Sequence, residues 1–262
     1  MARKIVITSG KGGVGKTTVT ANLGIALATL GQRVCLLDID FGLNNLDVVM
    51  GLENKVLYNM VDVLEGRCRI KQALIQDNYR KNLYVLPSGG IEGAHRISGQ
   101  NIKLLVENFE SLFDYMLFDC PAGIDLGFHR AVSCVNEAIV VATPNLTSLR
   151  DADKVVSILN SYKLDSVSLV VNRARGDLIM SEKMLAPQDV QALLKIDLIG
   201  VLPEEDIVFL TNGYSLPKKS DSSKAYKMLA LNVHKGNNKI FNATKKYSGF
   251  FGSIRRSVKK SI

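Results

Sequence analysis

Short, almost uninterrupted apolar runs alternate along this chain with longer segments of helical periodicity. Such runs are typical of parallel strands covered on both faces, because neither face of the strand meets water. Apolar residues that recur at a period of about 3.6 residues predict helices at 16–30, 101–112, 148–162 and 188–195. The runs predicted as strands are 4–9, 33–40, 82–87, 115–119, 137–144, 167–173 and 198–203.

This alternation predicts an α/β fold, a doubly wound and mainly parallel sheet with helices on both faces. Ligands of such sheets bind at the carboxyl ends of the strands. The polar residues of interest fall at those ends, since a glycine-rich segment follows the first strand, Asp38 and Asp40 end the second, and Asp119 ends the fourth. Ser148, with Asp151 in the next turn, predicts the N-terminal cap of a helix.

The glycine-rich segment at residues 10–17 reads GKGGVGKT and satisfies the phosphate-loop pattern GxxxxGK[ST] between a strand and a helix. Its glycines let backbone N–H groups approach phosphate oxygens, and the helix N-terminus adds a partial positive charge. Lys16 is expected to reach the β- and γ-phosphates, and Thr17 to offer its hydroxyl to Mg²⁺. The residues predicted to bind nucleotide here are Gly10, Lys11, Gly12, Gly13, Val14, Gly15, Lys16, Thr17 and Thr18.

Three carboxylates complete the chemistry of a P-loop ATPase. Asp38 and Asp40 stand at positions i and i+2 of a strand end, which directs both side chains toward one face. Asp119 ends the run YMLFD, an apolar strand closed by an acid, and residues 121–123 (PAG) follow as a predicted γ-phosphate switch. Phosphoryl transfer needs positioned water, a metal ion and positive charge, which these acids and lysines can organise. The chain lacks the guanine-reading Asn/Thr-Lys-x-Asp motif, which favours ATP as the nucleotide.

Composition narrows the class of protein further. The chain has 262 residues, 47% of them hydrophobic, and a mean hydropathy of +0.11, so it can bury a large core. No apolar stretch approaches the roughly 18 residues that a membrane-spanning helix needs. The N-terminus runs directly into the first strand, so neither a signal nor a transit peptide is expected. The four widely spaced cysteines predict reduced, mostly buried thiols.

The net charge of +8 belongs to the last part of the chain. Ten Lys or Arg and no Asp or Glu follow Asp221, which leaves residues 1–221 at −2. We therefore expect an ATPase domain at 1–235, a flexible linker rich in Asn, Lys, Gly and Ser at 236–248, and an amphipathic segment at 249–262.

On a helical wheel the apolar and basic residues of this last segment occupy opposite sides, which is the pattern of a helix that lies in a membrane interface. An anionic membrane is favoured over nucleic acid, because binding phosphates alone requires no apolar face. A nucleic-acid tail remains the alternative. The residues predicted to contact the membrane are Phe250, Phe251, Ile254, Arg255, Arg256, Val258, Lys259 and Lys260.

The loop KGGVGKT, with its additional Lys11, resembles the deviant Walker A motif of the ParA/MinD family of P-loop ATPases. This resemblance implies an ATP-dependent homodimer in which Lys11 reaches the partner's nucleotide. It also implies that Lys11, Lys16 and Asp40 are catalytic, with Asp40 acting on the attacking water. Thr17, Asp38 and Asp119 are implied to serve Mg²⁺, and Asn172 to contact the adenine. Without the resemblance, Asn172 is interpreted as a turn residue at a strand end.

Further motifs resemble the septum-site-determining branch of the same family. They include NLD at 45–47, QALI at 72–75, LRDADKV at 149–155 and GVLPE at 200–204. In that branch the start of the helix at 149–155 binds a MinC-like division inhibitor and a MinE-like regulator. The resemblance therefore implies a partner surface at Asn45, Arg150, Asp151 and Asp153, and the alternative is a solvated helix face. Asn44 departs from the arginine that is usual in the family.

Residues 49–77 resemble the plastid and cyanobacterial members, so we expect a peripheral membrane protein of the chloroplast stroma or of the bacterial cytoplasm. The predicted function is an ATPase that dimerises with ATP, binds membrane through its C-terminal segment and positions the division site. It would recruit an inhibitor, be reset by a regulator and bind no specific nucleic acid. The alternative is a ParA-type DNA-segregation ATPase that binds DNA non-specifically.

Overall fold

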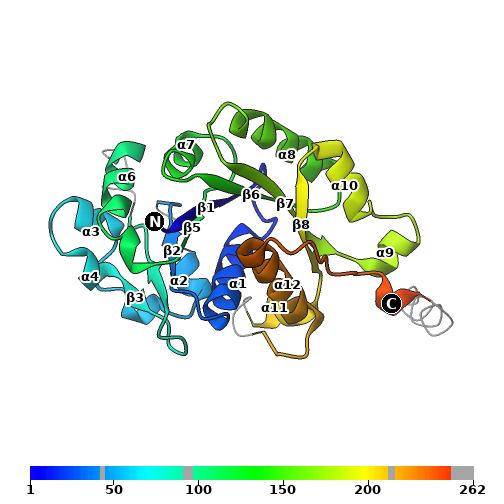
Figure 1. Cartoon of the computed structure of the whole chain (residues 1–262), viewed down its shortest axis with the longest axis horizontal. Helices are drawn as coiled ribbons and strands as arrows, with labels where there is room; N and C mark the ends of the chain where they lie inside the picture. The colour runs from blue at the N-terminus through cyan, green and yellow to red at the C-terminus, as the bar shows by residue number, and fades with distance from the viewer. Residues whose placement is uncertain (42–44, 91–96, 212–215, 249–262) are drawn as a thin grey trace.

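The computed structural model describes residues 1–41, 45–90, 97–211 and 216–248. Within them, eight strands form one sheet in the order β3-β4-β2-β5-β1-β6-β7-β8 (Figure 1). All neighbouring strands are parallel except β3 and β4. The strands are β1 (Arg3–Thr8), β2 (Val34–Asp38), β3 (Ile75–Gln76), β4 (Leu83–Leu86), β5 (Tyr115–Asp119), β6 (Glu137–Ala142), β7 (Ser166–Ala174) and β8 (Asp197–Pro203).

The helices lie on both faces and around the ends of this sheet (Figure 1). The α-helices are α1 (Lys16–Thr29), α2 (Leu46–Val49), α3 (Met60–Leu64), α4 (Ile70–Ala73), α6 (Gly99–Glu107), α7 (Leu126–Val132), α8 (Leu146–Leu159), α9 (Gly176–Met180), α10 (Pro187–Leu194), α11 (Asp206–Leu210) and α12 (Asp221–Lys235). Short 3-10 helices occur at η1 (Glu53–Lys55), η2 (Glu110–Leu112) and η3 (Lys245–Tyr247).

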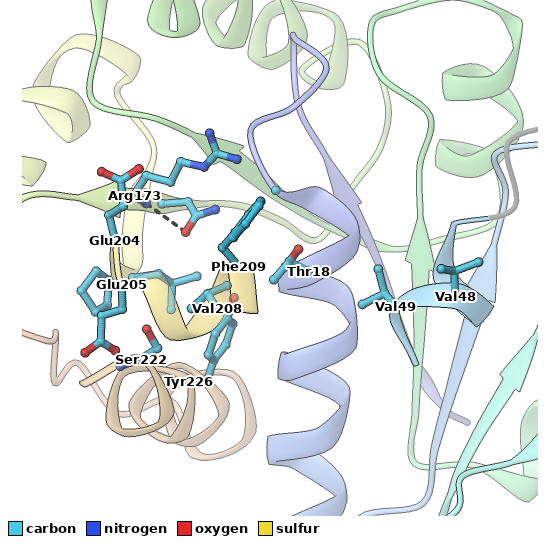
Figure 2. A pocket seen from close by; sticks show the side chains of 14 residues that line it. Thr18, Val48, Val49, Arg173, Glu204, Glu205, Val208, Phe209, Ser222 and Tyr226 are labelled. Carbon is cyan, nitrogen blue, oxygen red and sulfur yellow. Dashed lines mark hydrogen bonds between the residues drawn. The ribbon is translucent and has the colours of Figure 1, made fainter. Parts of the chain in front are cut away.

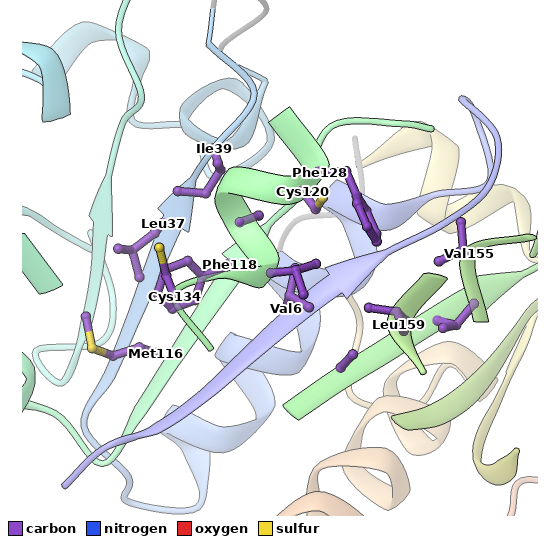
Figure 3. Packing of buried hydrophobic residues seen from close by; sticks show 14 of the residues in the cluster. Val6, Leu37, Ile39, Met116, Phe118, Cys120, Phe128, Cys134, Val155 and Leu159 are labelled. Carbon is purple, nitrogen blue, oxygen red and sulfur yellow. The ribbon is translucent and has the colours of Figure 1, made fainter. Parts of the chain in front are cut away.

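The sheet has an apolar core on each of its two faces, between the strands and the helices that cover them. This is because alternate residues of each strand face opposite sides. Ile5 of β1 packs with Leu23 of α1 and Leu229 of α12 on one face. Val6 packs on the other face, in the core that includes Phe128 of α7 and residues of α8 (Figure 3). The predicted doubly wound sheet covered on both faces is confirmed.

All seven predicted strands are present, with ends that differ by a few residues, whereas β3 was missed. The two-residue β3 is too short for a periodic pattern to reveal it. The cap predicted at Ser148 is wrong. Helix α8 begins at Leu146, and its cap is Asn145, whose Oδ1 accepts a hydrogen bond from the Ser148 N–H at 2.9 Å. The Ser148 hydroxyl instead accepts a hydrogen bond from the Thr143 N–H at 3.0 Å, which ties the helix to the end of β6.

Helix α12 ends at Lys235, where the ATPase domain was expected to end, and Gly236 follows it with a φ of +65°. The residues that follow, predicted as a linker, contact the body. Asn232 Nδ2 donates to the Lys239 carbonyl at 3.0 Å, and the side chain of Tyr247 is only 6% exposed. A Cβ on Gly176 of α9 would collide with the Ala243 carbonyl, so this segment lies directly on α9. The proposed division of the chain at 235 and 248 stays a prediction.

The predicted membrane residues Phe250, Phe251, Ile254, Arg255, Arg256, Val258, Lys259 and Lys260 lie outside the described residues, as does Asn44. Among the residues that are described, none of the helices is long and apolar enough to cross a membrane. All four cysteines are free, and Cys35, Cys120 and Cys134 are buried, as the sequence predicted.

Candidate nucleotide site

The phosphate loop connects the end of β1 to the start of α1, as predicted. Gly13 and Gly15 have φ angles of +75° and +95°, in the left-handed region that favours glycine. A Cβ on Gly15 would also lie 2.5 Å from Nδ2 of Asn172. Helix α1 starts at Lys16 without a hydrogen bond from a capping side chain, so its first N–H groups suit an anion.

The two lysines of the loop have different surroundings. Lys16 is buried at the first position of α1, whereas the side chain of Lys11 is exposed. The backbone beside Lys11 is held by Ser9, whose hydroxyl donates to the Lys11 carbonyl at 2.8 Å. A buried cation beside the loop suits phosphate neutralisation within the same molecule, and an exposed one suits contact with a second molecule.

Asp38 and Asp119 lie side by side at the carboxyl ends of β2 and β5, where they are register partners. Asp38 is 1% exposed and Asp119 is 3% exposed. The carboxylate of Asp38 accepts hydrogen bonds from the N–H groups of Asp40 at 2.9 Å and Leu46 at 3.2 Å. The hydroxyl of Thr20 donates to Oδ1 of Asp119 at 3.1 Å, and the hydroxyl of Thr17 also hydrogen-bonds to this carboxylate.

Burial and mutual repulsion make both carboxylates hard to ionise without a cation. Burial, followed by repulsion from Asp119, raises the pKa of Asp38 to about 8. Burial raises the pKa of Asp119 to about 6, while the hydrogen bond from Thr17 and the charge of Lys16 act in the opposite direction. A bound divalent cation would stabilise the charged forms of both acids.

Asp40 lies closer to solvent than Asp38, and its role at the attacking water stays a prediction. Its side chain is about half-buried, and this burial raises its pKa, while the nearby charge of Lys16 lowers it. The switch segment is tied to the residue before the phosphate loop, because the Gly123 N–H donates to the Ser9 carbonyl at 3.3 Å. Gly123 has a φ of +89°, so glycine suits this turn.

A pocket of about 540 Å³ opens beside the start of α1 (Figure 2). Gly15 of the loop, Thr18 of α1 and Asn172 of β7 contribute to its walls, together with residues 203–205. Nδ2 of Asn172 donates to the Val14 carbonyl at 2.7 Å, and its Oδ1 accepts from the Arg173 N–H at 2.9 Å. Asn172 therefore supports the phosphate loop and lines the pocket, while its predicted contact with adenine stays a prediction.

Sequence reasoning missed the apolar wall of this pocket. Val208 and Phe209 of α11 and Tyr226 of α12 line it, and Phe209 is 84% exposed. Figure 2 shows the Phe209 ring directed toward α1 and Thr18. The available signal was the run DIVFL, a short apolar helix directly after the two acids that follow β8.

Part of the predicted partner surface lies beside the phosphate loop. Arg150 and Asp153 are exposed on α8, and Asn45 is exposed at the start of α2. Asp151 pairs with Lys154 at 3.6 Å, and a Cβ on Gly10 would collide with the Asp151 backbone. The start of α8 thus packs against the phosphate loop, so a partner bound there would touch the nucleotide site.

The arrangement fits Mg²⁺ and a nucleoside triphosphate. The described residues hold no group of three His, Cys, Asp or Glu that would bind a metal by itself. Mg²⁺ binds through one or two carboxylates, with waters and substrate phosphates as its other ligands. Thr17, Asp38 and Asp119 are the residues that would hold it, and the bound ion would offset phosphate charge. The open N-terminus of α1 and the adjacent pocket suit the phosphates and the base.

Comparison with known proteins agrees with this geometry. Residues 2–171 match the family model described as an AAA domain. A putative septum site-determining protein MinD of Guillardia theta is 48% identical over 217 residues, which cover 83% of this chain and 81% of that protein. A chain of the MinC:MinD cell division protein complex of Aquifex aeolicus is 40% identical, with a TM-score of 0.83 over 91% of this chain and 98% of that one.

The septum site-determining protein MinD complexed with Mg-ADP from Pyrococcus horikoshii is 31% identical and has a TM-score of 0.80. The match covers 90% of this chain and 97% of that chain. The family and the ATP hydrolysis predicted from the phosphate loop are confirmed. With its phosphate loop, paired buried carboxylates and near full-length likeness to these proteins, the chain belongs to the MinD septum site-determining family of P-loop ATP hydrolases.

Proposed function

We propose that this ATPase helps to place the division site by cycling between a monomer and an ATP-bound homodimer that attaches to a membrane. The exposure of the Lys11 side chain is the observation that carries the proposal. This side chain is exposed on the phosphate loop and has no ion-pair partner in the part of the chain that the structure describes, whereas Lys16 is buried in the same loop. A cation held at the edge of a phosphate site is suited to act on the nucleotide of a second molecule, as an arginine finger does.

The surface around Lys11 supports a second copy as the occupant. Ile124, Leu126 and Leu146 are large, exposed apolar residues on the two segments that adjoin the phosphate loop. Both segments touch the loop, since a Cβ on Gly12 would lie 3.9 Å from the Ala122 Cβ and a Cβ on Gly10 would collide with the Asp151 backbone of α8. Exposed apolar side chains gathered at one place are typical of a protein interface.

The chemistry within each copy follows from its own side chains. Lys16 faces the phosphates from the start of α1, and Asp40 is placed near Lys16 with a carboxylate able to orient an attacking water and accept its proton. Lys11 of the second copy would add positive charge where charge develops on the transferred phosphoryl group. Hydrolysis would remove the phosphate that holds the copies together.

The segment 249–262 would then bind an anionic membrane weakly in a monomer and tightly in a dimer, because two linked segments bind with a high effective concentration. The solved relative bound to MinC supports a MinC-like inhibitor as a partner. We place that contact and a MinE-like regulator on Asn45, Arg150, Asp151 and Asp153. The membrane would be that of a plastid or of a bacterial cell, in line with the algal relative.

Light scattering of the purified chain tests the dimer. With Mg²⁺ and a non-hydrolysable ATP analogue we expect a dimer, and with ADP a monomer. Lys11→Ala should remain monomeric with the analogue while still binding it, whereas Lys55→Ala, which removes another exposed lysine, should dimerise normally. A wild-type monomer in the presence of the analogue, or a normal dimer of Lys11→Ala, would contradict the proposal.

Liposome co-sedimentation tests the membrane step. We expect the intact chain to bind anionic vesicles with the ATP analogue and to bind them at least tenfold less with ADP. A chain ending at Tyr247 should dimerise but not sediment. Equal binding with both nucleotides would argue against the cycle, and a DNA mobility shift without vesicle binding would favour the ParA-type alternative.

A further inference from the structure

A second cavity lies at the edge of the sheet opposite to the nucleotide site. It has a volume of about 720 Å³ and is formed by the β3–β4 hairpin, α4 and the segment that leads into β5. Its residues Arg33, Asn82 and Phe113 come just before β2, β4 and β5, so they mark the amino ends of these strands. The phosphate loop and the paired carboxylates stand at the carboxyl ends. We name this space the amino-end cavity.

The walls of the amino-end cavity are mostly apolar and are held in place. Leu74, Tyr84, Leu112 and Phe113 supply the apolar surface. The rings of Tyr84 and Phe113 meet edge to face, with centroids 5.7 Å apart. Leu112 lies at the opening and is 43% exposed, so the cavity leaves apolar surface in contact with water.

The hairpin that forms one wall is fixed by side-chain amides. Nδ2 of Asn82 donates to the carbonyls of Ala28 and Gln32, both at 2.8 Å, which joins the hairpin to the end of α1. Nε2 of Gln76 donates to the Lys81 carbonyl at 2.8 Å and to the Tyr84 hydroxyl at 3.0 Å. The cavity is therefore formed before any ligand arrives, and its volume is within the range of small-molecule sites.

The charged residues that line the cavity are all basic. Arg33, Lys71 and Lys81 are exposed around it, and no acid is among the described residues that line it. Arg33 is already neutralised by Asp114, with Nη2 2.7 Å from Oδ1, and this contact holds the pKa of Asp114 below its usual range. Lys71 and Lys81 have no ion-pair partner within the described ranges, so two positive charges face the opening uncompensated.

We propose that the amino-end cavity binds a small amphipathic anion, a carboxylate or phosphate monoester joined to an aromatic or short aliphatic body. The apolar floor would take the body, and Lys71 and Lys81 would take the charge. The chain's own segment 249–262 is not the occupant, because it carries Arg255, Arg256, Lys259 and Lys260 and would be repelled. In Figure 1, α4 and β3 also lie at the opposite end of the long axis from α9 and the C-terminal end of the described chain.

Calorimetric titration of the full chain tests this site, with Mg-ADP at saturation so that the nucleotide site is filled. The probes are 1-naphthoate and its neutral counterpart 1-naphthamide. We expect naphthoate to bind at least tenfold more tightly than the amide, and the double substitution Lys71→Glu with Lys81→Glu to weaken naphthoate at least tenfold. The double substitution Lys55→Glu with Lys163→Glu, which changes the net charge equally at exposed lysines elsewhere, should leave binding unchanged.

A second variant separates the apolar wall from the charge. Leu112→Asn at the exposed lip of the cavity should weaken naphthoate and amide alike without unfolding the protein. Hexanoate in place of naphthoate distinguishes a short aliphatic acid from an aromatic one, and tight binding of either supports the site. A parallel titration without Mg-ADP serves as the comparison. Equal binding to all variants, binding seen only when Mg-ADP is left out, or no measurable binding of any probe would overturn the proposal.

Discussion

Replacing Gly15 by alanine tests how the phosphate loop is supported. Two features of the structure oppose a methyl group at this position. The φ of Gly15 is +95°, which an L-residue adopts at a cost, and the added Cβ would lie 2.5 Å from Nδ2 of Asn172. The amide of Asn172 would have to move and would lose its 2.7 Å hydrogen bond to the Val14 carbonyl.

Gly31 is a matched position that separates the cost of the backbone conformation from the cost of displacing Asn172. Gly31 has a φ of +89°, and its Cβ would meet nothing within 4 Å, so Gly31→Ala carries the backbone cost alone. That cost is about 1–2 kcal/mol, less about 0.4–1 kcal/mol gained because alanine restricts the unfolded chain. Gly15→Ala adds the loss of a buried hydrogen bond, worth about 1–3 kcal/mol. We therefore expect Gly15→Ala to be less stable than Gly31→Ala by about 1–3 kcal/mol.

Urea unfolding of the nucleotide-free chain measures both costs, and a fluorescent ATP analogue measures binding. Gly15→Ala should bind the analogue at least tenfold more weakly, whereas Gly31→Ala should bind it normally. In an Asn172→Ala background, the extra cost of Gly15→Ala should largely disappear, because the side chain that it displaces is gone. Equal destabilisation by the two glycine substitutions would refute the reasoning.

Three further measurements follow from the structure. Burial and repulsion from Asp119 raise the pKa of Asp38 in the folded state to about 8, so the stability contributed by its protonation is complete below the unfolded pKa of about 4 and is lost as the pH rises toward 8. Urea unfolding without nucleotide should therefore give about 2 kcal/mol more stability at pH 6 than at pH 8.5, and the difference should shrink in Asp38→Asn. Phe209→Ala should raise the KM for ATP about tenfold by removing a wall of the pocket, whereas Leu210→Ala, which does not line it, should not. Gly176→Ala should displace the segment around Tyr247, seen as faster tryptic cleavage after Lys245 and Lys246 with little change in ATP hydrolysis.

The fold class was open to prediction from the sequence because its signals are local. Uninterrupted apolar runs mark the strands of a covered parallel sheet, and a glycine-rich turn before a helix marks a phosphate site whatever surrounds it. For the same reason the positions of Asp38 and Asp119 at strand ends were visible in the sequence. Asn145 illustrates the limit of local reasoning, because two plausible caps stand three residues apart and their hydrogen bonds decide between them.

Contacts between distant parts of the chain were decided only by the tertiary structure. Strand order places β2 next to β5, and this alone makes Asp38 and Asp119 a repelling, buried pair. The same order brings Asn172 to the loop at Val14, across 158 positions of sequence. The apolar wall at Phe209 likewise depends on where α11 packs.

The sequence by itself predicted a phosphate loop directly after the first strand, because a P-loop is a continuous segment whose chemistry depends on its own residues. The tertiary structure decided the carboxylate pair, the apolar wall of the pocket beside the loop, the segment held on α9 and the amino-end cavity. Each of these arises from residues that come together only when strands pair and helices pack, and no periodicity along the chain encodes that pairing.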